Sequence, residues 1–169
     1  MRLKALAVST VLTAALLGAC AAAPLPPGTW DARAAPVVEV TRDGDRWTAD
    51  YVFNRDAPVW AFMDSALIVD VRQPWRPEQW TVETPGVVME RRGAYDIIRS
   101  RDGGPVPRHV RFSIKPKAVD LEAEYGTQTF SDGAVALPTR QFDVFALASV
   151  EAAAAMPDDL NGVDLDGGP

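Results

Sequence analysis

Hydrophobic and polar residues alternate along much of this chain. Residues 47–53 place Trp, Ala, Tyr and Phe at every second position, and residues 108–115 do the same with Val110, Phe112 and Ile114. A period of two is typical of a strand with one buried and one solvated face, which antiparallel sheets provide. The pattern therefore predicts antiparallel β-structure.

Turn residues separate these runs at short intervals. Asp43-Gly44 lies between residues 37–41 and 47–53, and this dipeptide predicts a tight hairpin. Further apolar or alternating runs occupy residues 58–62, 66–71, 79–83, 87–91, 95–99, 119–125, 133–137 and 141–147. Strands of this length with no amphipathic helix between them favour a sandwich or a barrel. We predict an all-β fold, an antiparallel β-sandwich over residues 37–148.

One short helix is predicted after the sandwich. Ser149 can cap it, Glu151 lies in its first turn, and Pro157 ends it. Residues 158–169 are acidic and glycine-rich. Residues 149–169 are therefore interpreted as a C-terminal helix and an acidic tail.

The N-terminus has the pattern of a signal peptide over residues 1–19. Arg2 and Lys4 precede an apolar run at residues 5–17. A membrane-spanning helix needs about 20 apolar residues, so this run is short for a permanent anchor. Residues 20–36 contain several prolines among small residues and are interpreted as a tether.

Residues 17–20, Leu-Gly-Ala-Cys, resemble the lipobox of bacterial lipoproteins, and Cys20 is the only cysteine. The resemblance implies that Cys20 is acylated and begins the mature chain. In this lipoprotein pattern an aspartate directly after the cysteine signals retention in the inner membrane, and Ala21 stands there instead. For a Gram-negative source, the resemblance therefore implies an outer-membrane lipoprotein on the periplasmic side. The alternative is an ordinary cleavage site with a chance cysteine beside it.

Composition excludes several classes of chemistry. The chain has 17 basic and 23 acidic residues, with a net charge of −6, and lacks the basic footprint of a nucleic-acid-binding protein. One histidine and one cysteine exclude multi-histidine zinc sites and intrachain disulfides. We expect no metal and no cofactor, and we interpret His109 as a surface residue on its strand.

Carboxylates are the remaining candidates for catalysis. Asp120, Glu122 and Glu124 would share one face of a strand over residues 119–125. Two carboxylates at a suitable separation suffice for glycoside hydrolysis. Such a row is more often a solvated face, so a carboxylate-only hydrolase is kept as an alternative.

Residues 73–80 combine two tryptophans, an arginine and two prolines. If Trp80 begins a strand, its ring lies in the core on the same face as Val82. The candidate interaction site consists of Trp75, Arg76 and Trp80. Trp75 lies outside that alternation, so Trp75 with Arg76 is the better candidate for its exposed anchor. The alternative is that both indoles pack over the end of the sandwich with the arginine stem against a ring.

Residues 47–60 and 108–125 resemble the N-terminal β-domain of glycyl-aminopeptidase-like metallopeptidases. The zinc-binding H-E-x-x-H motif of that family is absent here, so no catalytic role carries over. We expect a lipid-anchored periplasmic domain without catalytic activity that binds or scaffolds an envelope protein or polymer. The alternatives are the non-catalytic β-domain of a peptidase-like protein and the carboxylate-only hydrolase.

Overall fold

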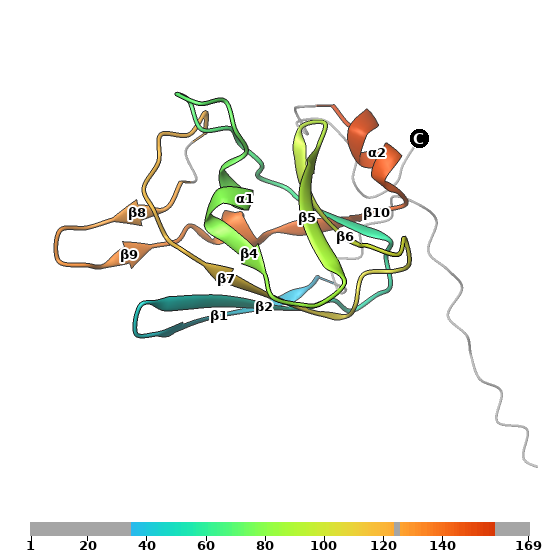
Figure 1. Cartoon of the computed structure of the whole chain (residues 1–169), viewed down its shortest axis with the longest axis horizontal. Helices are drawn as coiled ribbons and strands as arrows, with labels where there is room; N and C mark the ends of the chain where they lie inside the picture. The colour runs from blue at the N-terminus through green and yellow to red at the C-terminus, as the bar shows by residue number, and fades with distance from the viewer. Residues whose placement is uncertain (1–34, 124–125, 158–169) are drawn as a thin grey trace, which may run out of the picture.

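The computed structural model describes residues 35–123 and 126–157, and it shows an all-β, sandwich-like fold (Figure 1). One antiparallel sheet has the order β1 (Val37–Asp43), β2 (Arg46–Val52), β7 (His109–Ile114) and β4 (Trp80–Val82). The other has the order β10 (Val144–Leu147), β3 (Val59–Phe62), β6 (Tyr95–Ser100) and β5 (Val87–Arg92). A separate hairpin joins β8 (Gln128–Thr129) to β9 (Val135–Ala136). The predicted fold class is confirmed.

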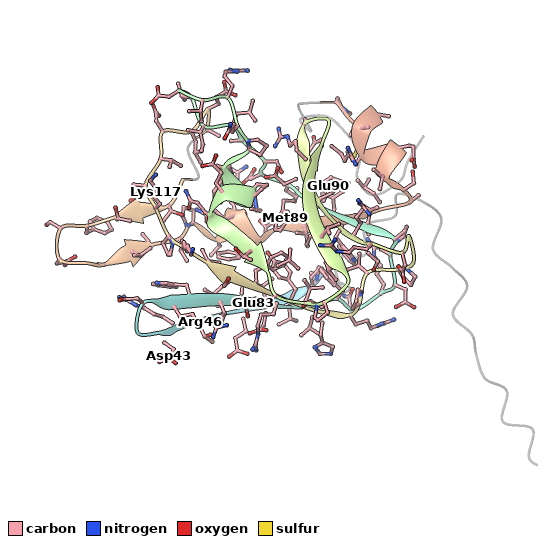
Figure 2. All side chains as sticks on the ribbon, in the orientation of Figure 1. Asp43, Arg46, Glu83, Met89, Glu90 and Lys117 are labelled. Carbon is pink, nitrogen blue, oxygen red and sulfur yellow. The ribbon has the colours of Figure 1, made fainter. Side chains whose placement is uncertain are left out.

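The predicted hairpin is formed by β1 and β2. Gly44 has a φ of +59° in the connecting turn, a conformation that glycine adopts without steric cost. On the outer face of the sheet, the Arg46 guanidinium pairs with the Glu83 carboxylate at 2.7 Å, and Figure 2 shows both side chains beside the hairpin.

The inner faces of the two sheets enclose an aromatic core. Tyr51 on β2 packs edge-on against Phe112 on β7, with 5.5 Å between ring centroids. From the opposite sheet, Trp60 stacks on Phe53 at 4.4 Å. All four rings are buried, as the alternation of residues 47–53 and 108–115 predicts. His109 is exposed on the opposite face of β7, as expected.

The second sheet is covered on both faces. Helix α2 (Val150–Ala155) packs against its outer face, where Ala153 joins an apolar cluster with Tyr95 and Phe145. The Ser149 side chain accepts a hydrogen bond from the Ala152 amide, which confirms the predicted cap. Because both faces are buried, β3 is a continuous apolar run rather than an alternating one.

Two predicted strands are not formed. Residues 66–71 and the described part of 119–125 meet only through an isolated bridge between Ile68 and Leu121. Val69 and Val71 are exposed instead of buried. An apolar run becomes a strand only where a partner lies along its length, and neither segment has one in the described residues.

Two short helical segments were not predicted. Helix α1 (Trp75–Gln79) and the 3₁₀ segment η2 (Thr139–Phe142) each form a single turn. Pro77 fits α1 because it lies in the first turn, where its missing N–H would have no intrahelical partner. The proline-rich segment is therefore a helical turn rather than an extended loop.

Candidate functional site

An open groove of about 750 Å³ lies between the β1–β2 hairpin and the segment that leads into β10. Its lining is mainly apolar and consists of Ala35, Pro36, Val38, Val40, Trp47, Met63, Leu137, Thr139, Phe142, Asp143 and Val144. Ligand sites typically have volumes of about 300–1,000 Å³ and apolar walls with a few polar groups. The groove has the size and composition of such a site.

The groove is open because the second sheet leaves the inner face of β1 uncovered. Strands β1 and β10 are the outermost strands of their sheets in the described residues. Val40 pairs with Ala49 and shares its face, yet Val40 is 37% exposed whereas Ala49 is fully buried. Apolar surface that would be covered in a complete sandwich therefore forms one wall.

Buried side chains hold the opposite wall in place. The Arg76 guanidinium donates to the Gln141 carbonyl at 2.7 Å, and the Tyr51 hydroxyl donates to the Phe142 carbonyl at 3.1 Å. Both carbonyls belong to η2, which precedes the groove residues of β10. The buried side chains of Arg76 and Tyr51 thus fix the position of η2, which forms this wall of the groove. The single turn of η2 is too short to be stable alone.

Asp143 is the carboxylate that lines the groove. Partial burial raises its pKa above the ordinary value, and the nearby Asp64 carboxylate raises it further, while Arg140 opposes the shift. Arg140 pairs with Asp64 at 3.0 Å. Asp143 has no ion pair among the described residues, so it is available to a cation or hydrogen-bond donor in the groove.

The structure places Trp75, Arg76 and Trp80 in the interior. Trp75 and Arg76 have no exposed surface, and Trp80 is 2% exposed. The expectation that Trp75 is an exposed anchor is wrong, because α1 turns its ring inward to pack edge-on against Trp80 at 6.3 Å. Trp80 lies in the core, as its position at the start of a strand predicts, so its assignment to the candidate interaction site is wrong. These three residues are part of the interior packing. They affect the groove only by helping to fix η2, which forms one of its walls.

Arg76 is surrounded by aromatic rings and hydrogen-bond acceptors. Its guanidinium lies 3.9 Å from the ring centroid of Phe62, and it also faces the two tryptophans. It donates to the Asp64 carbonyl and approaches the Asp96 carboxylate at 3.5 Å. Burial raises the pKa of Asp96, and the charges of Arg76 and Arg91 oppose that increase.

A second, more polar hollow of about 500 Å³ lies near residues 63–67 and 91–95. Its charged groups already engage each other or the backbone. Arg72 pairs with Glu122, and Arg91 donates to the Ser65 carbonyl at 3.0 Å. This hollow therefore presents fewer available groups to a ligand than the apolar groove does.

The other sequence candidates do not form a site in the described residues. Asp120 and Glu122 do not share a strand face, because residues 119–123 are not a strand. Cys20, Glu124 and the tail 158–169 lie outside the described residues. Within the described ranges, no group of three His, Cys, Asp or Glu side chains could hold a metal ion.

No helix in the described part of the chain is both long enough and apolar enough to cross a bilayer. Comparison of the chain with known protein families, with curated proteins and with solved structures finds no match.

Sequence reasoning missed the groove itself. Residues 37–41 indicated a strand, but the pattern did not show that β1 would be an edge strand without a facing neighbour. One signal was present: Val37, Val38 and Val40 place apolar side chains on both faces of β1. A strand with apolar residues on both faces needs cover on both sides, and β1 lacks it in the described residues.

Proposed function

We propose that this protein is a non-catalytic, lipid-anchored binding domain of the bacterial envelope that holds an apolar group in the groove between β1 and β10. The observation that carries the proposal is the uncovered apolar wall of that groove beside the carboxylate of Asp143. The apolar surface supplies binding energy, and Asp143 can orient a ligand that carries a donor or a positive charge.

Attachment to the membrane is the second part of the proposal. It is supported by the lipobox-like residues 17–20, by the apolar run before them, and by the proline-rich tether at 21–36. More than one acyl chain on Cys20 would give stable attachment, because a single chain gives only marginal binding. The outer membrane is the proposed location, since Ala21 follows the cysteine.

We expect Cys20→Ser to abolish acylation and to move the protein from the detergent phase to the aqueous phase in a partition experiment. Labelling with a palmitate analogue measures the modification directly. Continued labelling and detergent partition of the Cys20→Ser protein would show that the lipobox interpretation is wrong.

The groove is tested with a small apolar fluorophore, N-phenyl-naphthylamine. We expect saturable binding with increased fluorescence, and Leu137→Glu should weaken the affinity about tenfold or more, because it places a charge on the apolar wall. Leu137 is outside the aromatic core, so the variant should remain folded.

Val52→Glu is the control for this experiment. Val52 is 40% exposed on β2 and is not part of the groove lining. Its replacement should leave the affinity for the fluorophore within about twofold of the wild type. Equal losses for both variants, or no saturable binding to the wild type, would remove the groove as the binding site.

A further inference from the structure

The free edge of β1 is long and regular in the described residues, and its protection is limited to the charged side chains of Glu39, Arg42 and Asp43. β1 pairs with β2 in unbroken register from Val37 to Asp43, without a bulge. The strand contains no proline or glycine and has no strand neighbour on its other side. Proteins usually interrupt such edges with prolines or bulges, because the unpaired backbone groups recruit other strands.

This edge is also apolar on both faces. Val37 is 65% exposed on the outer face, and Val40 is 37% exposed on the face toward the groove. A strand added beside β1 would cover both valines while satisfying its free backbone groups. Figure 1 shows the turn end of the β1–β2 hairpin projecting from the body of the molecule.

We propose that the occupant of this edge is a second copy of the same chain. The two β1 strands pair antiparallel about a twofold axis at Val40 and join their four-stranded sheets into one continuous sheet. This inference goes beyond the proposed function, because it concerns self-association and needs no ligand. A twofold interface buries the same patch on both copies, so each copy covers the other's exposed valines.

The charges along β1 select this register. With Val40 opposite its own symmetry mate, Glu39 lies opposite Thr41, and Asp43 lies opposite Val37. Centring the axis on Glu39 would place two glutamates together, and centring it on Thr41 would place Glu39 opposite Asp43. Like charges in directly opposite positions destabilise a strand pair. The Val40 register avoids both repulsions.

The same register brings a cation to the groove. Arg42 of the second copy lies opposite Val38, which lines the groove together with Asp143. Opposite residues of neighbouring strands point to the same face, so this arginine extends toward the groove side. Within its own copy Arg42 donates to the Gly44 carbonyl and lies over the Trp47 ring. In the dimer it would exchange these exposed contacts for the Asp143 carboxylate, which has no ion pair among the described residues. The second copy thereby contributes a residue to the binding site.

Disulfide trapping tests the register. Single-cysteine variants are made in the full chain carrying Cys20→Ser and are oxidised under mild conditions. Opposite Cα atoms in an antiparallel pair are about 4.5–5.5 Å apart, within disulfide range. Val40→Cys should therefore give at least about tenfold more covalent dimer than Val52→Cys, whose parent valine is similarly exposed at 40%. Glu39→Cys should trap poorly, since its mate is displaced diagonally by about 7–8 Å.

Sedimentation equilibrium without oxidant gives the independent measurement. The Cys20→Ser chain should sediment with twice the monomer mass, and Val40→Lys should restore the monomer while keeping the circular dichroism spectrum. Leu137→Glu should remain dimeric because Leu137 is not on β1, which separates failure of this proposal from failure of ligand binding. A monomeric parent protein, or equal trapping at positions 40 and 52, would overturn the proposal.

Discussion

Replacement of Arg76 with alanine is expected to lower the free energy of unfolding by about 3–5 kcal/mol. The side chain is fully buried and donates to the carbonyls of Asp64 and Gln141. Its loss leaves the two carbonyl oxygens without this donor, and it removes one of the positive charges that compensate the buried Asp96 carboxylate. Urea unfolding of wild type and variant measures the difference.

Arg46→Ala provides the control for charge alone. The Arg46 side chain is 62% exposed and pairs with Glu83, and exposed pairs contribute about 0.2–1 kcal/mol. We also expect Arg76→Lys to be clearly destabilising, because one ammonium cannot reproduce the planar fork between the rings and the carbonyls. If Arg76→Ala cost no more than Arg46→Ala, the interior network would not stabilise the fold as described.

The cost of Arg76→Ala should depend on pH. Burial raises the pKa of Asp96, and the charge of Arg76 is the largest single effect that opposes the increase. A carboxyl group with a raised folded-state pKa contributes stability that is present at low pH and lost as the pH rises through that pKa. Without Arg76 the pKa rises further, so the difference between wild type and variant should shrink as the pH is lowered.

Trp75→Ala is expected to reduce stability by about 3–5 kcal/mol, as for other large aromatic side chains removed from a core. The Trp75 ring is fully buried, packs edge-on against Trp80, and lies 4.6 Å from the Arg76 guanidinium. Thermal and urea unfolding should both detect the cavity that the substitution leaves.

Phe130→Ala is the aromatic control for the Trp75 substitution. Phe130 is 53% exposed next to β8, so its removal should change stability by less than about 0.5 kcal/mol. Similar stability losses for the two variants would contradict the inward position of Trp75.

Local patterns along the chain predicted much of the fold. The alternation in β2 and β7 identified the buried faces, and Asp43-Gly44 located the hairpin turn. The cap at Ser149 located the start of α2. Each of these signals depends on neighbours within a few residues, which is why the sequence alone could show them.

Features that depend on distant partners were not predictable in this way. Residues 66–71 are as apolar as a strand but find no strand partner in the described residues. The environment of Arg76 combines the backbone of Asp64 and Gln141 with rings from β3, α1 and β4. The groove likewise depends on how far the sheet that contains β1 extends past the sheet that contains β10. No local sequence pattern indicates this.

The most direct test of the groove as the binding site is a titration of the isotopically labelled protein with N-phenyl-naphthylamine, followed by amide NMR shifts. We expect the largest shifts at Val38, Val40 and Leu137, with saturation at the concentration that saturates fluorescence. Shifts concentrated instead around Arg72 and Arg91, at the polar hollow, would contradict this expectation.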